Sequence, residues 1–274
     1  MVCALGLAVP SNAAPDGATM LRLRVYRFVD HSRTIRLPDG RTAPRTLETI
    51  VRYPAAARDE PLVVFGHGFA LTPAPYAPLL RAWAEAGYVV AAPVFPLGNA
   101  NAPGGPDESD LVNQPRDLSF VISRLLVVLH GTIDPSRIAV AGHSDGAETA
   151  LATAYDSRYR DPRIAAAIVL SGAAFPGMAP FPAHGPPLLA AQGTADPINS
   201  PSNTTAFFAR ARRPKFLLWL EGASHRPPYT DEQPQLAIVE RATIAFLDHY
   251  LKDAPLAALR AAARAPYARL SADP

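Results

Sequence analysis

Short apolar segments that alternate with helical patterns constrain the fold of this chain more than any other feature. The apolar segments are Leu62–Phe65, Tyr88–Ala92, Ile138–Ala141, Ile164–Leu170, Leu188–Ala191 and Phe216–Leu220. Between them, apolar side chains recur with helical spacing at about 76–86, 115–130, 145–156, 202–212 and 234–251. Strands that are apolar throughout are typical of parallel sheets with both faces covered. The alternation therefore predicts an α/β fold with a mostly parallel, doubly wound sheet.

The region ahead of these segments follows a different pattern. Leu21–Phe28 alternates apolar and polar side chains, as a half-exposed strand does. Thr46–Tyr53 has the composition of a second strand, and Asp39-Gly40 between the two is a hairpin turn signal. We therefore expect antiparallel strands at the N-terminal edge of the sheet.

The two ends of the chain carry separate expectations. Val2–Val9 is a short apolar run, and the small residues that follow it fit signal-peptidase cleavage after Ala13. We expect residues 1–13 to be a truncated signal peptide and the protein to be secreted; the alternative is a frayed N-terminus on a cytoplasmic protein. Residues 14–274 are expected to form a single domain. The tail Asp253–Pro274, rich in Ala and Arg, is compatible with a terminal helix or a loose tail.

Composition excludes several classes of function. The 26 Lys and Arg against 24 Asp and Glu are not gathered in blocks, so no nucleic-acid partner is expected. The one cysteine, Cys3, excludes an intramolecular disulfide and a cysteine-based zinc site. No apolar run approaches the roughly 20 residues of a membrane span. The sequence also lacks H-E-x-x-H, and we expect neither metal nor cofactor.

The strongest chemical signal is Gly142-His143-Ser144-Asp145-Gly146. It fits G-x-S-x-G and lies between a predicted strand and a predicted helix, which is the context of a nucleophile elbow. Glycine on both sides of the serine avoids collisions in the sharp turn. A chance match in a chain rich in Gly and Ala is the alternative, and the strand–helix context argues against it.

A nucleophilic serine needs a base, and the base needs a carboxylate that orients it. His225 follows the last buried strand by a short loop and is favoured as the base over His184 and His249. For the acid we favour Asp196, which lies in a tight turn after Leu188–Ala191. The other acids considered are Asp156 and Asp161, which read as solvated loop residues, and Glu221, which lies at its own strand end.

Two backbone N–H groups are expected to form the oxyanion hole. One belongs to Asp145, directly after the nucleophile, and the other to Phe69 in the loop Gly66–Ala70. His67 and His143 flank these donors and are expected to support the turns rather than to react. The Pro- and Gly-rich stretches at 93–115 and 171–187 are too short to form a cap domain, so the site should be open to solvent.

From Leu47 to Leu251 the chain resembles the α/β-hydrolase superfamily. The motifs are His67-Gly68-Phe69-Ala70, Trp83–Val90, Gln114–Leu118, Gly142-His143-Ser144, Gly193-Thr194-Ala195-Asp196 and Gly222-Ala223-Ser224-His225. They are most similar to the cap-less bacterial cutinase-like polyester hydrolases and to their chlorophyllase- and dienelactone-hydrolase-like relatives. A serine rather than a cysteine at the elbow argues against dienelactone hydrolase chemistry.

The resemblance implies a serine carboxylic-ester hydrolase that works through an acyl-serine intermediate. It also implies an aromatic wall at Phe175, which with Phe69 and Tyr229 would line a cleft for hydrophobic or bulky esters, polyesters included. The substrate would be a small-molecule or polymeric ester, and we expect a monomer. Asp145 departs from the methionine that cutinase-like enzymes usually carry there, and their C-terminal disulfide cannot form.

Two other readings stay open. A non-catalytic α/β-hydrolase relative that binds ligands or partners is the main alternative, although such proteins normally lose a triad residue or an oxyanion glycine. Peptidase or amidase activity has no specific signal in the sequence.

Overall fold

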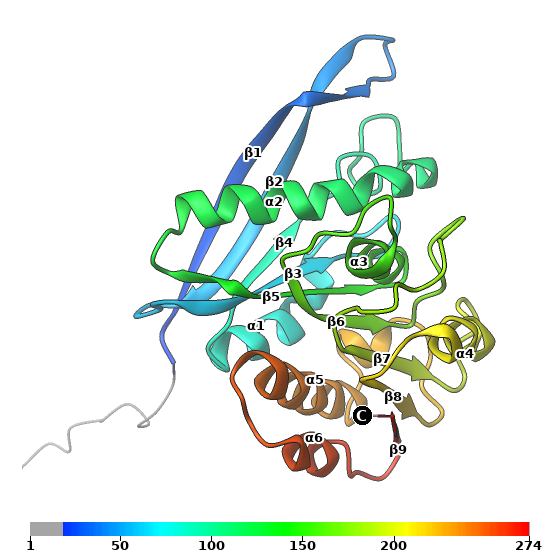
Figure 1. The fold of residues 1–274 in the computed structure, drawn as a ribbon. Helices are drawn as coiled ribbons and strands as arrows, with labels where there is room; N and C mark the ends of the chain where they lie inside the picture. Colours follow the sequence, from blue (N-terminus) through cyan, green and yellow to red (C-terminus); the bar gives the residue numbers. More distant parts are fainter. Residues whose placement is uncertain (1–18, 274) are drawn as a thin grey trace, which may run out of the picture.

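A computed structural model describes residues 19–273, and the signal peptide predicted at 1–13 lies outside the described residues. These residues form one nine-stranded sheet in the order β1-β2-β4-β3-β5-β6-β7-β8-β9 (Figure 1). The strands are β1 (Leu21–Arg36), β2 (Thr42–Pro54), β3 (Glu60–Gly66), β4 (Val89–Pro93), β5 (Ile133–His143), β6 (Ile164–Leu170), β7 (Leu188–Gly193), β8 (Lys215–Leu220) and β9 (Ala268–Asp273).

The centre of the sheet, from β4 through β3, β5, β6 and β7 to β8, is parallel. The strands at both edges run antiparallel: β1 to β2 and β2 to β4 on one side, and β9 to β8 on the other. The mostly parallel, doubly wound sheet predicted from the sequence is confirmed, and so are the antiparallel N-terminal strands. No separate cap covers the carboxyl ends of the central strands in the described residues.

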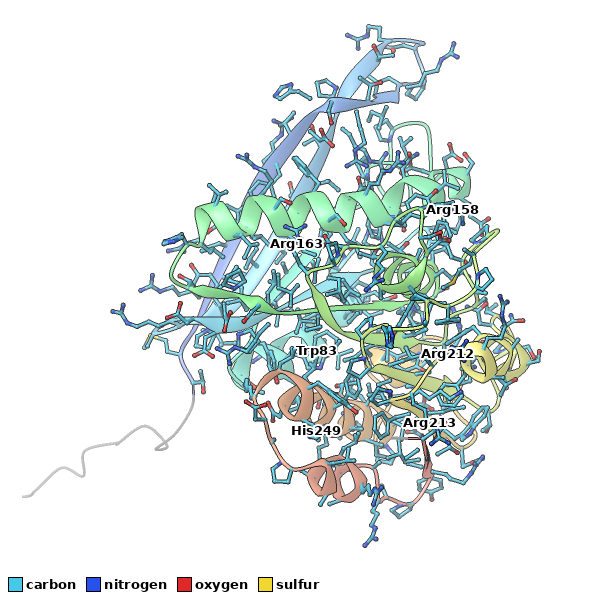
Figure 2. The ribbon with its side chains drawn as sticks, in the orientation of Figure 1. Trp83, Arg158, Arg163, Arg212, Arg213 and His249 are labelled. Carbon is cyan, nitrogen blue, oxygen red and sulfur yellow. The ribbon has the colours of Figure 1, made fainter. Side chains whose placement is uncertain are left out.

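Helices cover both faces of the sheet, because its central strands are apolar on both sides. One face packs against α1 (Ala77–Glu85), α5 (Gln235–Leu251) and α6 (Leu256–Ala262). The other packs against α2 (Gln114–Val128), α3 (Asp145–Tyr155) and α4 (Pro201–Arg210). The side chain of Trp83 on α1 contacts α5, where its Nε1–H donates to Thr243 Oγ1 over 2.8 Å (Figure 2).

Three short 3-10 helices complete the chain: η1 (Ala74–Tyr76), η2 (Glu108–Asn113) and η3 (Pro227–Tyr229). All three precede longer helices or follow strand ends near the carboxyl edge of the sheet. None of the helices in residues 19–273 is both long enough and apolar enough to cross a membrane.

The tail is ordered in the structure. Leu256–Ala262 forms α6, and Ala268–Asp273 pairs with β8 along its whole length, from Lys215↔Asp273 to Leu220↔Ala268. Leu259 of α6 is fully buried in the core on the α5 side. The choice that the sequence left open is therefore settled as a helix followed by an edge strand.

Candidate active site

The elbow at Ser144 follows from the close approach of three backbone segments. Ser144 joins β5 to α3 with φ 55° and ψ −124°, a strained conformation for a residue with a side chain. A Cβ on Gly142 would lie 2.0 Å from the carbonyl oxygen of Gly146, and one on Gly146 would lie 2.0 Å from that of Gly66. Only glycine fits at either position, so the G-x-S-x-G pattern is a packing requirement of this turn.

Three side chains predicted from the sequence meet at the carboxyl edge of the sheet. His225 Nε2 lies 3.0 Å from Ser144 Oγ, and His225 Nδ1 lies 2.8 Å from Asp196 Oδ2. A carboxylate only accepts hydrogen bonds, so Nδ1 carries the imidazole proton and Nε2 is free to accept the hydroxyl proton. The three residues follow β5, β7 and β8, and the order of the strands in the sheet brings them together.

Asp196 is held as an anion by several donors. Its Oδ1 accepts hydrogen bonds of 2.9 Å from the N–H groups of Ile198 and Asn199, and Gln192 donates to Oδ2 over 3.2 Å. Burial alone would raise its pKa, but the hydrogen bonds from His225 and from the two backbone N–H groups hold the pKa below its ordinary value. The carboxylate is therefore ionised and fixed in place at neutral pH.

The other candidates for base and acid lie elsewhere. His249 is on α5, where its Nδ1–H donates to the Ala254 carbonyl over 2.6 Å (Figure 2). His184 is an exposed loop residue. The sequence suggested that Asp156 and Asp161 are solvated loop residues, but both are buried. They accept hydrogen bonds from Arg158 and Arg163 respectively.

The two predicted oxyanion donors have N–H groups that are free within the described chain. No backbone carbonyl of residues 19–273 accepts a hydrogen bond from the N–H of Phe69 or of Asp145. His67 stabilises the loop before Phe69: its Nε2 accepts from the Phe95 N–H over 3.1 Å, and its Nδ1–H donates to the Gly68 carbonyl over 2.9 Å. Burial lowers the pKa of His67 to about 4, so the ring is neutral.

A chain of hydrogen bonds joins this loop to the backbone of the base. The Gly68 N–H donates to Tyr76 Oη over 3.4 Å, the Tyr76 hydroxyl donates to His143 Nδ1 over 2.7 Å, and His143 Nε2–H donates to the His225 carbonyl over 2.9 Å. Burial, with the neighbouring His225, lowers the pKa of His143 to about 3 and keeps that ring neutral. Tyr76 was not singled out from the sequence, where it only begins an apolar helical pattern.

The structure contradicts the predicted placement of two aromatic residues. Tyr229 is fully buried, with its hydroxyl donating to the Ala191 carbonyl over 3.1 Å and 2.9 Å from Ser171 Oγ. Phe175 is also buried and packs edge-on against Tyr159, with ring centroids 5.4 Å apart. Both rings fill the interior beneath the site and neither lines the cleft.

The cleft above Ser144 has a volume of about 470 Å³. Its apolar lining is Phe69, Leu71, Pro197, Ile198 and Pro227, and its charged lining is Glu108, Asp145 and Arg226. Phe69 is thus the one aromatic residue of the predicted wall that lines it. Among residues 19–273, no group of three or more His, Cys, Asp or Glu side chains could hold a metal ion.

Asp145 combines two opposite properties. Its N–H is one of the two predicted oxyanion donors, while its carboxylate is buried and its Oδ2 has no hydrogen-bond partner in the described residues. Burial, and then the negative charge of Glu108, raise the pKa of this carboxyl to about 6. No ion pair involves this carboxylate in residues 19–273, so no bound cation offsets its charge beside the predicted oxyanion hole.

The sequence model of the chlorophyllase family matches residues 29–195, which is more than half of the chain. The chain belongs to the chlorophyllase family. The matched region includes the elbow and the donor loop and ends just before Asp196. A comparison with curated proteins finds no match.

Among solved structures, this chlorophyllase-family chain is similar to a ferulic acid esterase from Streptomyces cinnamoneus, with a TM-score of 0.72 and 23% identity. The alignment covers 93% of this chain and 95% of the esterase. At that identity the likeness establishes the fold, which is that of the α/β-hydrolases. Family and fold together identify the chain as a carboxylic ester hydrolase.

Proposed function

We propose that the protein hydrolyses carboxylic esters through an acyl intermediate on Ser144, with His225 as general base and acid and Asp196 as the orienting carboxylate. The observation that carries this is the pair of contacts at His225, 3.0 Å to the serine and 2.8 Å to the aspartate. The elbow strain at Ser144 and the neutral, fixed rings of His67 and His143 support it.

The chemistry then runs in two balanced halves. Ser144 Oγ forms a bond to the ester carbonyl carbon while its proton passes to His225 Nε2. The carbon–oxygen bond to the alcohol breaks, and the leaving alkoxide takes the proton from His225. Water then attacks the acyl carbon and gives a proton to His225. The bond from that carbon to Ser144 Oγ breaks, Oγ takes the proton back from His225, and the acid is released.

Negative charge develops on the carbonyl oxygen in both halves. The N–H groups of Phe69 and Asp145 are the proposed donors to that oxyanion, and the N-terminus of α3 adds a favourable dipole. Donors of this kind contribute about 3–4 kcal/mol each to transition-state stabilisation in serine hydrolases.

For the substrate we propose esters with a hydrophobic or extended acyl chain. The apolar side chains of the cleft and the absence of a cap in the described residues support an acyl group that runs along an open surface. The same openness favours a polymer chain as a second candidate substrate, and Ile198, 68% exposed at the rim, would contact it.

A series of 4-nitrophenyl esters of rising acyl length tests the proposal. We expect turnover by the wild type and a loss of at least about a thousandfold in kcat in Ser144→Ala, because triad residues act as a unit. Ser136→Ala, which changes an exposed serine of β5, is the matched control and should retain full activity. Activity retained by Ser144→Ala would overturn the assignment. Release of soluble acid from a polycaprolactone film, in the same variants, tests the polymer.

A further inference from the structure

A second cavity of about 390 Å³ adjoins the cleft and shares Glu108 and Asp145 with it. Its third carboxylate is Glu148, and its apolar lining includes Leu111, Val112 and Pro176. We call it the acidic pocket. Glu108 comes from η2, whereas Asp145 and Glu148 lie one turn apart at the start of α3.

The three carboxylates have no cationic partner. None of them forms an ion pair with a Lys, Arg or His side chain of residues 19–273. Asp145 is only 9% exposed, and its Oδ2 lacks any hydrogen-bond partner there. Burial and the neighbouring carboxylates raise the pKa of Glu148 to about 8, as burial and Glu108 raise that of Asp145. An ionised carboxylate whose buried oxygen has no donor, as at Asp145 Oδ2, costs free energy, and a cation bound beside it would offset that cost.

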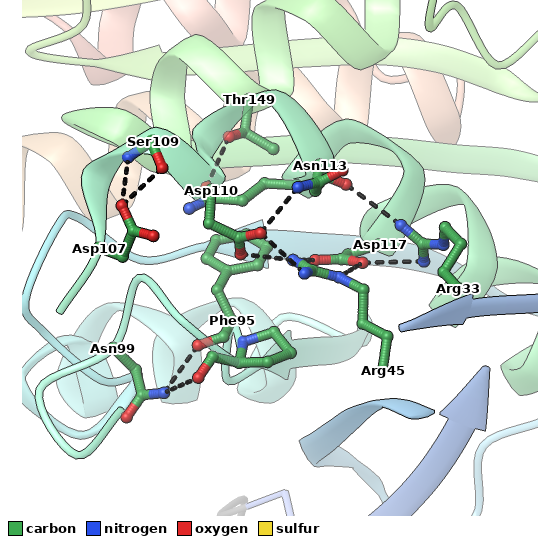
Figure 3. Close-up of polar contacts among 12 residues, drawn as sticks. Arg33, Arg45, Phe95, Asn99, Asp107, Ser109, Asp110, Asn113, Asp117 and Thr149 are labelled. Carbon is green, nitrogen blue, oxygen red and sulfur yellow. Dashed lines mark hydrogen bonds and ion pairs between the residues drawn. The ribbon is translucent and has the colours of Figure 1, made fainter. Parts of the chain in front are cut away.

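Arginines next to the pocket are already bound to other acceptors: Arg45 to two carboxylates, and Arg158 to Asp156 and to the carbonyl of the lining residue Pro176. Arg45 binds Asp110 of η2 through two hydrogen bonds of 2.6 and 2.8 Å and binds Asp117 of α2 through two more of 2.6 and 2.7 Å (Figure 3). The Thr149 hydroxyl donates to Gln114 Oε1 over 2.8 Å, which ties α3 to the start of α2. The segment that presents Glu108 is thus fixed by cations already committed to other carboxylates.

We propose that the acidic pocket binds an ammonium group on the acyl portion of the ester substrate. In the proposed mechanism the alcohol leaves beside His225, which protonates it. The pocket shares none of His225, Arg226 or Pro227 with the cleft, so it faces the acyl portion. Glu148 follows Ser144 by four residues, a rise of about 6 Å along the helix. A carbonyl at Ser144 and an ammonium at Glu148 are therefore separated by a short alkyl chain, which Leu111, Val112 and Pro176 would contact.

The ligand also explains why a carboxylate sits beside the oxyanion hole. An ionised Asp145 opposes the negative charge that develops on the carbonyl oxygen, but a bound ammonium would neutralise it. An ammonium ester thus supplies the missing countercharge, whereas a neutral ester leaves the repulsion in place. This inference rests on the proposed function, because it places the acyl chain relative to Ser144 and His225.

The test compares 4-nitrophenyl 6-aminohexanoate with 4-nitrophenyl heptanoate, which has the same chain length without the charge. We expect kcat/KM of the wild type at pH 8 to be about tenfold higher for the ammonium ester, as for a charge-assisted contact. The ratio should fall about fivefold in Glu148→Gln and in Asp145→Asn. Glu85→Gln, an exposed carboxylate on α1, is the matched control and should leave the ratio unchanged. A wild-type ratio of one or less, or equal ratios in all four proteins, overturns the proposal.

Two further arms sharpen this experiment. The ratio should rise from pH 5 to pH 8, because Asp145 and Glu148, whose pKa values are about 6 and about 8, gain negative charge over this range. Glu108, Tyr76 and Arg226 are the other titratable groups that face Asp145. The 2-aminoethyl ester of heptanoic acid carries the charge on the alcohol, and its preference over the ethyl ester should be small; an equal preference overturns the acyl-side placement.

A binding measurement separates the two proposals. Hexylammonium chloride should bind Ser144→Ala, measured by calorimetry, and should bind at least about fivefold more weakly when Glu148→Gln is added. Binding without Ser144-dependent hydrolysis of either ester would retain the pocket and reject the proposed function. Hydrolysis that depends on Ser144, with no binding of hexylammonium above that of hexanol, would do the reverse.

Discussion

The carboxylates on the two sides of Ser144 have opposite hydrogen-bonding environments. On the His225 side, Asp196 accepts hydrogen bonds from His225, Gln192 and two backbone N–H groups. On the other side, Asp145 has an unpartnered Oδ2, and Glu148 has only carboxylates as charged neighbours. The pKa of Asp196 is lowered, whereas those of Asp145 and Glu148 are raised to about 6 and about 8.

The difference shows what donors do to a carboxylate at similar depth. Burial opposes ionisation on both sides, but only Asp196 has enough donors to reverse that effect. A carboxylate saturated with donors is a fixed anion that can orient an imidazole. A carboxylate with an unpartnered oxygen, such as Asp145, keeps hydrogen-bonding capacity for a ligand. This contrast can be tested from either side.

The largest expected effect comes from removing the negative charge of Asp196. Asp196→Asn keeps the shape of the side chain but can donate to His225 Nδ1, which favours the wrong tautomer. We expect kcat for a 4-nitrophenyl ester to fall by about 10³–10⁴-fold. Asp156→Asn alters an equally buried carboxylate, paired with Arg158, and should leave kcat nearly unchanged. A loss of less than tenfold in Asp196→Asn would point to another acid.

The next effect concerns the cation that fixes the wall of the acidic pocket. Arg45 is 2% exposed and serves Asp110 and Asp117, so Arg45→Met leaves two buried carboxylates without their main partner. We expect the free energy of unfolding, from urea denaturation at pH 7, to fall by about 3–5 kcal/mol. Arg41→Met breaks a solvent-exposed ion pair with Asp39 and should lower the free energy of unfolding far less than Arg45→Met does. Equal losses in the two variants would contradict the role assigned to Arg45.

A smaller effect is expected from breaking the series of hydrogen bonds that runs through Tyr76 and His143. Tyr76→Phe removes the hydroxyl between Gly68 and His143, so the donor loop and the His225 backbone are no longer linked. We expect kcat to fall about tenfold with KM nearly unchanged, since the change acts on the positioning of catalytic groups. Tyr155→Phe is the control, because its buried hydroxyl donates to the Pro186 carbonyl, outside the site. A change in KM alone would place Tyr76 in binding instead.

The parts of this molecule that the sequence predicted are those set by backbone geometry. The central strands and α1–α5 follow from local periodicity, and Ser144, Asp196 and His225 follow strand ends that a parallel sheet brings to one edge. The elbow is recognisable because Gly142 and Gly146 meet backbone atoms, which no side chain can tolerate.

What the sequence did not predict depends on contacts between distant segments. Tyr229 and Phe175 have the composition of a cleft wall, but only the packing of η3 and of the loop after β6 decides that they point inward. Likewise, Asp145 and Asp156 look alike in the sequence. Arg158 lies two residues after Asp156 and pairs with it, whereas no cation reaches Asp145 in the described residues.

The smallest expected effect is on stability and comes from Glu148 in the acidic pocket. The folded pKa of Glu148, about 8, exceeds the ordinary value of 4.5, so the folded state holds this proton more tightly than the unfolded state. The stability that this provides is complete below about pH 4.5 and is lost as pH rises through about 8. Glu148→Gln removes that dependence.

We therefore expect the variant to gain on the wild type by about 1 kcal/mol in free energy of unfolding between pH 5 and pH 9. Partial exposure of Glu148 keeps this below the value for a fully buried group. Urea denaturation across that range measures the effect, and Glu85→Gln should show a flat difference. If Glu148→Gln were also flat, solvent or an internal donor must already stabilise the ionised form. Glu148 would then resemble Asp196, and the contrast between the two sides of Ser144 would rest on Asp145 alone.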